Sequence, residues 1–435
     1  MTNNSQTPGQ LLFAELTINL DEVPIEQLAD YTAVEYYLTV EDEPPPDAIN
    51  LEKVRRYLEA FNHLSKVQNW EASGKVLLTR LDTPTKQLLH DQLGTWGYYN
   101  EQVDLYEPLI KNCDLILKVI ALNGIAMSYH AQGEYSKAID YLEEALRIRF
   151  KIFDVQGIAM TVGHLGIVYD SLGYSDTAIQ CHQIHLNTAQ NIQDREGESM
   201  ALGNLGNAYM TSGDSIKAIQ YHHQHLVMAR ELQDRRGEGN ALGSLGSIYN
   251  SLRYSNTAVE YHRQRLLIAE EIQDSAGEIG ALNNLGLAYE IQGNCKKALK
   301  YCKKALLLAQ EVKDPYSQGK ILANLGNIYR KLGQYVKAID CLQQCINIKK
   351  KLQDIRGEGY ALKYLGNAYY CQGDYIKAIE SYQNSLSIIR KIQDEEAHEQ
   401  ILIYSGMAYC ALEDYEKAIA SNQQHLAIVQ KKYSS

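Results

Sequence analysis

A tyrosine recurs at intervals of 40 residues along most of this 435-residue chain. Its positions are Tyr129, Tyr169, Tyr209, Tyr249, Tyr289, Tyr329, Tyr369 and Tyr409. An alanine follows each tyrosine nine residues later, from Ala138 to Ala418, and a glycine stands three residues before seven of them. A period of this length without slippage predicts a stack of eight equal copies, each of which contacts mainly its neighbours.

Each copy has the pattern of two helices. In the copy that closes at Asp354, Leu322, Leu325 and Tyr329 recur at steps of three and four residues, which is the spacing of one helical face. Gly333 is expected to end this first helix in the left-handed conformation. Asp354 is expected to cap the next helix, because its carboxylate can accept hydrogen bonds from unpaired amides. One pair cannot cover its own apolar face, so neighbouring pairs must stack.

These residues carry a family resemblance. The segment 325–329 (Leu-Gly-x-x-Tyr) followed by Ala338 resembles the tetratricopeptide repeat, and residues 118–432 hold eight copies of the pattern. Segments 203–209 (Gly-Asn-Leu-Gly-Asn-x-Tyr) and 261–266 (Tyr-His-x-Gln-x-Leu) are similar to the 40-residue variety of Partner-of-Inscuteable-type adaptors and bacterial multi-repeat proteins. The resemblance implies an all-α fold, a right-handed superhelical solenoid of antiparallel helix pairs, with a concave groove that receives a partner peptide.

The start of the chain has a different pattern. Apolar and polar residues alternate over 14–20 and again over 34–40, which is the period of β-strands. We therefore expect a small β-containing N-terminal extension of two short strands, too small to be stable unless it docks on the helices. The expected divisions are residues 1–46 for this extension with its Pro-rich spacer at 44–46, 47–117 for divergent capping helices, and 118–435 for the repeats.

Signatures of catalysis are absent from the sequence. No H-E-x-x-H, Walker loop or G-x-S-x-G elbow occurs. Gly237, Gly239 and Gly243 have the spacing of a dinucleotide fingerprint, but they open a repeat helix with no strand before it, which favours close helix packing. We expect no enzymatic activity, no catalytic residues and no cofactor.

Histidine pairs on the second helices allow two interpretations. His182 with His185, and His222 with His225, could present several imidazoles to a metal ion. Leu342 holds the equivalent position of another copy, however, so packing and hydrogen bonding between helices are favoured. We expect no metal site.

A polar, largely uncharged face lies opposite the core face of the first helices. At about 100° per residue, Lys320, Asn324, Asn327 and Lys331 share one surface of their helix. Asparagine offers both a donor and an acceptor, so a ladder of these side chains could pair with the backbone of a bound peptide. The alternative is that they bind neighbouring backbone and stiffen the stack. The predicted peptide-binding residues are Asn204, Asn207, Asn284, Lys320, Asn324, Asn327, Arg330, Lys331, Lys363 and Asn367.

Charge and composition narrow the class of partner. The formal charge of −11 argues against a nucleic-acid partner, whereas Lys320, Arg330, Lys331 and Lys363 form a local basic cluster that favours an acidic segment of a protein partner. The eight cysteines contain no C-x-x-C pair, so we expect free thiols. The sequence shows neither a signal peptide nor an apolar run long enough for membrane insertion, so we expect a cytoplasmic protein.

The sequence supports two hypotheses of function. The first is a protein–protein interaction adaptor or scaffold that binds a peptide in its groove. The second is a regulatory sensor that binds a peptide or small effector and controls a partner enzyme. We also expect a weak homodimer through residues 415–432 of the C-terminal repeat, because Leu426, Ile428 and Val429 lack a following helix to cover them.

Overall fold

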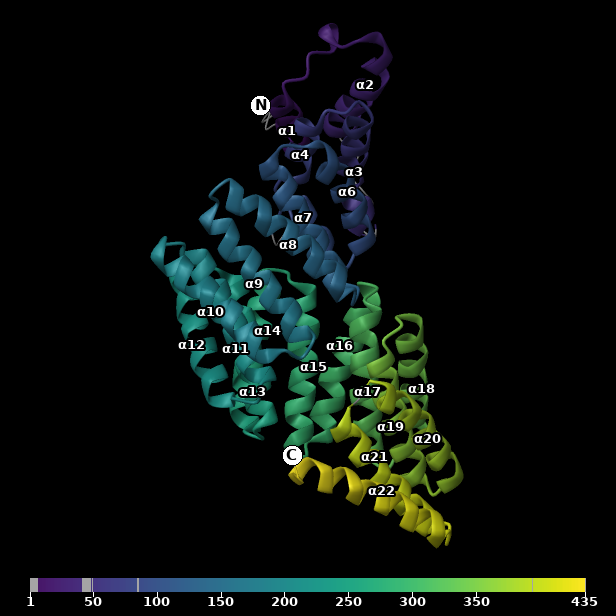
Figure 1. Cartoon of the computed structure of the whole chain (residues 1–435). Helices are drawn as coiled ribbons and strands as arrows, with labels where there is room; N and C mark the ends of the chain where they lie inside the picture. Colours follow the sequence, from purple (N-terminus) through teal and green to yellow (C-terminus); the bar gives the residue numbers. More distant parts are fainter. Residues whose placement is uncertain (1–6, 41–47, 49, 84–85, 393, 435) are drawn as a thin grey trace. The chain divides into compact units, whose positions relative to one another are not determined.

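The structure, a computed structural model, describes residues 7–40, 48, 50–83, 86–392 and 394–434. Apart from one isolated β-bridge between Arg80 and Leu88, every regular element in these ranges is helical (Figure 1). The N-terminal elements are α1 (Pro8–Leu16), the 3-10 helix η1 (Leu20–Glu22), α2 (Ile25–Thr39), α3 (Asn50–Lys66), α4 (Trp70–Leu77), α5 (Leu89–Thr95) and α6 (Tyr99–Asn112).

Sixteen further helices form the repeat copies, two to a copy. The first helices are α7 (Leu115–Ala131), α9 (Val155–Ser171), α11 (Arg195–Thr211), α13 (Arg235–Ser251), α15 (Ser275–Ile291), α17 (Pro315–Lys331), α19 (Ile355–Gln372) and α21 (Glu395–Ala411). The second helices are α8 (Tyr135–Lys151), α10 (Ser175–Asn191), α12 (Ser215–Glu231), α14 (Ser255–Glu271), α16 (Cys295–Glu311), α18 (Tyr335–Lys351), α20 (Tyr375–Lys391) and α22 (Tyr415–Ser434).

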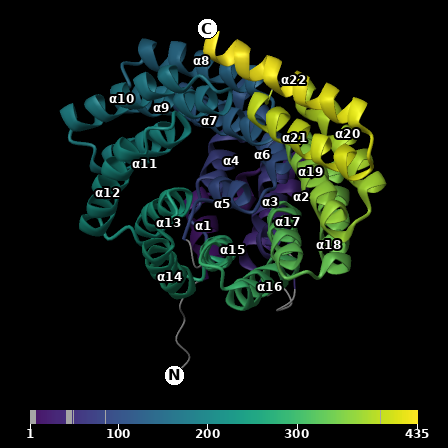
Figure 2. The ribbon, with the colours of Figure 1, turned by 90° about the horizontal axis from the view of Figure 1, so that it is seen from below.

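The chain divides into two compact units, residues 1–237 and residues 238–435. Within each unit, helices that follow one another in the sequence pack against one another. In the second unit, α16, α18, α20 and α22 lie on the outer side of the arc formed by α15, α17, α19 and α21 (Figure 2). We call the opposite side of α15, α17, α19 and α21 the inner face of the second unit.

The predicted helix boundaries are confirmed at both ends of a helix. Asp354 accepts a hydrogen bond of 2.7 Å from the Gly357 amide and so caps α19. Gly333 has φ 71°, a left-handed conformation that a glycine adopts without steric cost. Since equivalent aspartates and glycines recur in other copies, the same local chemistry sets the length of the helices along the chain.

Close contact between the two helices of a copy explains the recurring glycine and alanine. A Cβ atom at Gly326 would lie 2.6 Å from Cγ of Leu342 on the second helix, and Ala338 has no exposed surface. Larger side chains at these positions would push the helices apart. The core of this part of the second unit joins residues of several copies, from Ala258 to Ala368.

The recurring tyrosine is also explained by its contacts. Tyr289 stacks on Tyr301 of the second helix with ring centroids 5.4 Å apart, and the Lys297 ammonium lies 5.1 Å from the Tyr289 ring. A second copy repeats this arrangement with Tyr209 and Tyr221. These stacked pairs and the cation contact hold the turn between the two helices.

The prediction of two N-terminal strands is wrong. Residues 14–16 form the end of α1, which a Thr7 capping box begins, and residues 34–39 belong to α2. Residues 17–19 connect α1 to η1 and form no strand. Val34 and Leu38, four residues apart, are fully buried, whereas Tyr36 between them is 55% exposed, so the apolar residues follow the helical period and not the alternation of a strand. The Pro-rich spacer at 44–46 lies outside the described residues.

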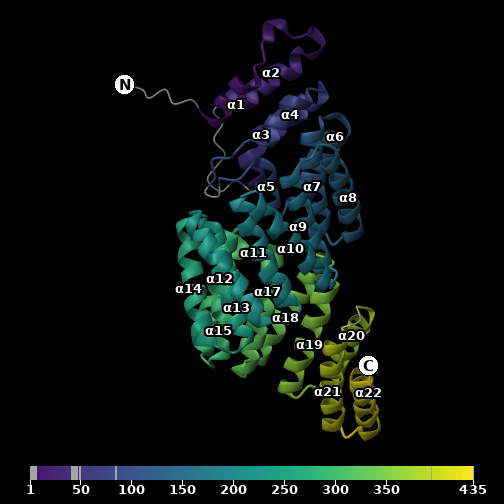
Figure 3. The same cartoon turned by 60° about the vertical axis from the view of Figure 1, so that its left-hand side comes forward.

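The N-terminal helices do dock on the helices that follow. Leu12 of α1 and Val34 of α2 belong to one hydrophobic cluster with Leu64 of α3, Leu93 of α5 and Ile125 of α7. Figure 3 shows α1 to α7 as one continuous stack. Among the described residues, none of the helices combines the length and the apolar character that crossing a membrane requires.

Candidate functional site

The inner face of the second unit brings together most of the predicted peptide-binding residues. Its first helices contact one another as α15 with α17, α17 with α19, and α19 with α21. On α17, the core positions Leu322 and Leu325 are buried, whereas Lys320, Asn324 and Asn327 on the other side are exposed or half-buried. The helical periodicity therefore correctly placed these side chains on the side of α17 opposite the core. Asn204 and Asn207 occupy the equivalent positions of α11 in the first unit.

Three of the predicted asparagines are held by other side chains. Asn324 donates to Oδ1 of Asn283 at 2.9 Å, which links α17 to α15. Asn284 donates to the Ser247 hydroxyl at 3.4 Å, and Asn367 accepts from the Tyr382 hydroxyl at 2.8 Å. For these three side chains, the alternative interpretation of a stiffened stack has direct structural support.

The other three asparagines keep their amide groups available. Within the described ranges, no protein group hydrogen bonds to the side chains of Asn204, Asn207 or Asn327. Asn207 is exposed, and the other two are half-buried. Each therefore presents one donor group and one acceptor to an incoming backbone.

The four cations of the predicted basic cluster differ in their contacts with the rest of the protein. Lys331 forms an ion pair with Glu290 of α15, so its charge is neutralised locally. Lys363 is only 5% exposed; it donates to Gln400 at 2.9 Å, and its ammonium lies 4.6 Å from the Tyr360 ring. Burial lowers the pKa of Lys363. Neither lysine is a free surface charge.

Arg330 and Lys320 remain as cations without a carboxylate partner among the described residues. Arg330 is half-buried and donates weakly to the sulfur of Cys371 at 3.8 Å. Lys320 has no hydrogen-bond partner and its side chain is open to water. Protein nevertheless surrounds its ammonium group: burial, and then the charges of Arg265 and Lys349, lower the pKa of Lys320.

Arg265 is the functional candidate that the sequence reasoning missed. It belongs to α14, a second helix, yet its guanidinium group lies between two first helices. A Cβ at Gly243 of α13 would collide with this group, and one at Gly280 of α15 would lie 3.4 Å from its Nη2 atom. Glycines at both positions leave the space that the arginine occupies, and that pairing of a long cation with two small residues was a signal available in the sequence.

The histidines are core residues, as the packing interpretation predicted. The rings of His182 and His222 lie against Gly166 and Gly206 respectively, where Leu342 lies against Gly326 in another copy. Burial lowers the pKa of both imidazoles to about 4. The predicted hydrogen bonding is found for His262, which contacts the Asn250 amide at 3.2 Å, but Nδ1 and Nε2 of His222 have no partner.

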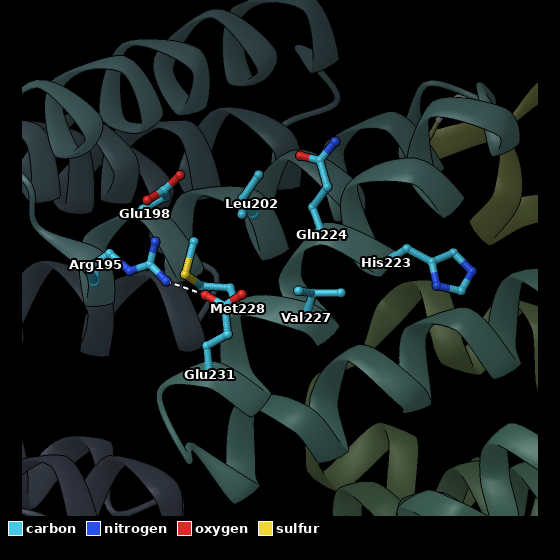
Figure 4. A pocket seen from close by; sticks show the side chains of 8 residues that line it. All are labelled: Arg195, Glu198, Leu202, His223, Gln224, Val227, Met228 and Glu231. Carbon is cyan, nitrogen blue, oxygen red and sulfur yellow. Dashed lines mark hydrogen bonds and ion pairs between the residues drawn. The ribbon is translucent and has the colours of Figure 1, made fainter.

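Two pockets lie away from most of the predicted peptide-binding residues. One, of about 420 Å³, lies between α11 and α12 and is lined by Leu202, Val227 and Met228, with the Arg195–Glu231 ion pair at its edge (Figure 4). It contains none of the predicted binding residues. The other, of about 230 Å³, lies in the second unit at the Lys331–Glu290 ion pair.

Comparison with known sequences identifies the repeat. Profiles described as tetratricopeptide repeat match residues 119–150, 161–196, 201–236, 278–351 and 359–431. These segments together span more than half of the chain. The matching profiles do not distinguish the 40-residue variety of Partner-of-Inscuteable-type adaptors from other tetratricopeptide repeats. Comparison with the curated proteins found no match.

Solved structures with low sequence identity share the fold. A Rap protein in complex with competence and sporulation factor has a TM-score of 0.57 at 14% identity, covering 87% of this chain and 98% of that one. Aspartyl phosphate phosphatase F from Bacillus subtilis has a TM-score of 0.52 at 12% identity, covering 90% and 96%. A signal transduction ATPase with a tetratricopeptide repeat sensor from Pyrococcus horikoshii has a TM-score of 0.51 at 15% identity, covering 99% and 74%.

Proposed function

Since this chain belongs to the tetratricopeptide repeat family, we propose that it is a protein-interaction scaffold whose inner face binds an extended segment of a partner protein. The observation that carries the proposal is the unpaired amide of Asn327, which lies on the same helix as the cations Lys320 and Arg330. Asn207 holds the position equivalent to Asn327 three copies earlier, in the first unit, and Asn204 lies on the same helix as Asn207; their amides are also unpaired among the described residues. A peptide backbone has the matching pattern of carbonyl and amide groups.

The engaged asparagines support this proposal indirectly. Asn283 and Asn324 join α15 to α17, and the Tyr382 hydroxyl fixes Asn367 on α19. A surface whose helices are cross-linked in this way loses little conformational freedom when a ligand binds, which favours affinity. The predicted residues therefore fall into two roles: Asn284, Asn324 and Asn367 hold the surface, and the unpaired residues contact the partner.

The charge of the surface favours an acidic partner segment. Lys320 and Arg330 carry this preference, whereas Lys331 and Lys363 contribute little because their charges are paired or buried. Affinity is expected to fall as salt rises, since the contacts are open to water and are screened. A titration of the partner at two ionic strengths measures this, and an unchanged dissociation constant would remove these cations from the interaction.

Capture from native lysate, followed by peptide mapping, tests the scaffold function. The wild-type chain is compared with a variant in which Asn204, Asn207 and Asn327 are all alanine. We expect each removed amide to cost about 1 kcal/mol of binding free energy while the melting temperature changes little. Asn324→Ala is the matched control, because it should lower stability by leaving Asn283 unpaired. Equal partner affinity of the triple variant and the wild type would contradict the proposal.

A regulatory sensor is the second candidate function. The observation that favours it is the shared core of the N-terminal helices and the repeats, which includes both Leu12 of α1 and Ile125 of α7. A change in the repeats of the first unit can reach α1 and α2 through these contacts. Structures similar to this chain include a phosphatase and an ATPase with a repeat sensor. Hydrogen exchange of α1 and α2 with and without partner distinguishes the two functions, because only the sensor requires a change there.

A further inference from the structure

Arg265 and Lys320 approach each other from different helices of the second unit. Arg265 extends from α14 into the space beside Gly243 and Gly280. Gly280 holds in its copy the position that Lys320 holds in the next one, 40 residues later. Because α15 and α17 are packed together, the guanidinium beside Gly280 lies next to the helix that carries Lys320.

Asp274 is the carboxylate that acts on Arg265, and Lys349, whose charge acts on Lys320, already has an anion of its own. Asp274 favours the charged form of Arg265, yet it lies beyond ion-pair distance and caps α15 through the Gly277 amide at 3.0 Å. Asp354 forms an ion pair of 2.7 Å with Lys349. Among the described residues, neither Arg265 nor Lys320 has an ion pair or a hydrogen bond to a protein group.

Keeping two like charges close together without an anion costs free energy. Burial opposes the charged form of both groups and lowers the pKa of each, and the charge of Arg265 further opposes protonation of Lys320. An anion placed between them would relieve this repulsion. Positions equivalent to Arg265 hold alanine or cysteine in the next two copies, at Ala305 and Cys345, so helix packing does not require an arginine there.

We propose that Arg265 and Lys320 form a phosphate-binding subsite that receives a phosphorylated side chain of the bound partner segment. The proposal rests on the proposed scaffold function. The guanidinium group can donate two parallel hydrogen bonds to an oxyanion, and the Lys320 ammonium can donate to a third oxygen of a phosphate group. A phosphate group carries a charge of about −1.5 to −2 near pH 7, whereas a carboxylate carries only one negative charge. The presence of two cations thus favours phosphate over carboxylate.

Inorganic phosphate tests the subsite without any partner. Thermal unfolding of the full chain is measured over a phosphate series at constant ionic strength, with chloride as the replacement anion. We expect phosphate to raise the melting temperature of the wild type, and Lys320→Gln and Arg265→Gln each to weaken this effect at least tenfold in apparent affinity. Lys300→Gln, on the exposed surface of α16, is the matched control and should respond as the wild type does. An equal response in all four proteins would overturn the proposal.

Lys320→Gln keeps the test valid if Arg265→Gln folds poorly, because Lys320 makes no hydrogen bond or ion pair to a protein group among the described residues. A second measurement uses the captured partner segment synthesised with serine, glutamate or phosphoserine at one position. We expect at least tenfold tighter binding of the phosphoserine form, and loss of that preference in both variants. Equal affinity for the glutamate form would show a general carboxylate site instead. Partner capture that succeeds while phosphate has no effect would leave the scaffold function standing and reject this subsite.

Discussion

The imidazole of His222 lies directly over the α-carbon of Gly206: a Cβ atom there would be 2.6 Å from both Cε1 and Nε2 of the ring. His262 has the same relationship to Gly246. The glycine is thus required by the large side chain on the facing helix, and the two residues form a matched pair within each of these two copies.

Gly206→Ala is expected to destabilise the chain. Alanine gains about 1 kcal/mol of helix propensity, but the collision with His222 costs about 1–3 kcal/mol and dominates unless the ring moves. Gly239→Ala is the matched control, since its Cβ would meet only Ile268 at 3.4 Å, an ordinary contact. Chemical denaturation should give a lower midpoint for Gly206→Ala and an unchanged or higher one for Gly239→Ala. A higher denaturation midpoint for both variants would show that the two helices of a copy can move apart at little cost in free energy.

Acid is expected to unfold the histidine-rich copies. The folded-state pKa of His182 and of His222 lies at about 4, below the usual value of an exposed imidazole. A lowered folded pKa means that the unfolded chain binds protons first, so the contribution to stability is complete above the unfolded pKa and is lost as the pH falls toward the folded one. The contribution to stability is therefore lost between about pH 6.5, the unfolded pKa, and the folded pKa.

His222→Leu tests this acid sensitivity. Leucine fits the site because Leu342 lies on Gly326 in the equivalent place. Between about pH 7 and pH 5, the variant should lose about 1–2 kcal/mol less stability than the wild type, measured by urea denaturation at each pH. Parallel pH profiles of the two proteins would show that the ring of His222 is not the titrating group.

Local chemistry made much of the fold predictable. Gly333 and Asp354 marked helix ends because a left-handed cap and a carboxylate cap each need a particular residue type. The exact period then carried the aspartate cap to every copy and the glycine cap to most of them, since Arg253 and Glu413 hold the glycine position in two copies. The N-terminal segment failed because Val34 and Leu38 fit both a strand and a helix, and only tertiary packing shows that Tyr36 lies on the exposed side.

The sequence predicted on which helix face the candidate residues lie, but it did not predict which residues they contact. Periodicity places Lys320, Asn327 and Lys331 on one face, yet it cannot show that Glu290 of the neighbouring copy neutralises Lys331. Arg265 was missed because helical periodicity assigns a residue to the face of its own helix. Its side chain is long enough to pass the small residues of the adjacent helices, and only the structure shows where its charge lies.

Asp354→Ala is expected to be more destabilising than removal of an ordinary cap. Burial alone would raise the pKa of Asp354, but hydrogen bonds from Lys349 and the Gly357 amide outweigh it and lower the pKa. Its loss uncaps α19 and leaves Lys349, which is 8% exposed, without its anion, at a cost of about 2–4 kcal/mol. Asp214→Ala, which removes an exposed cap, should cost less.

A double variant separates the two contributions of Asp354. Alanine replaces Lys349 naturally in the preceding copy, at Ala309. Asp354→Ala combined with Lys349→Ala should therefore recover part of the stability that Asp354→Ala alone loses, measured by the denaturation midpoint. A double variant less stable than the single one would show that the lysine stem, and not its unpaired charge, determines the loss.

Self-association through residues 415–432 is predicted from the exposed face of α22. Leu426 is 54% exposed and Ile419 is 57% exposed, and their seven-residue separation places them on one stripe of the helix. Ile428 and Val429, expected on the same surface, are half-buried, so the apolar stripe is narrower than the sequence suggested. Two copies can bury it across a two-fold axis, and the small area indicates a weak dimer.

Light scattering over a concentration series measures this association. Leu426→Glu should abolish the rise in average mass, because a carboxylate would be buried at the contact without a partner. Gln424→Glu adds the same charge on the exposed surface of α22, about 160° around the helix from Leu426, and serves as the control; it should still associate, with some loss from charge repulsion. A wild-type chain that stays monomeric at the highest concentration would contradict the prediction, and equal loss in both variants would assign the effect to net charge and not to the apolar stripe.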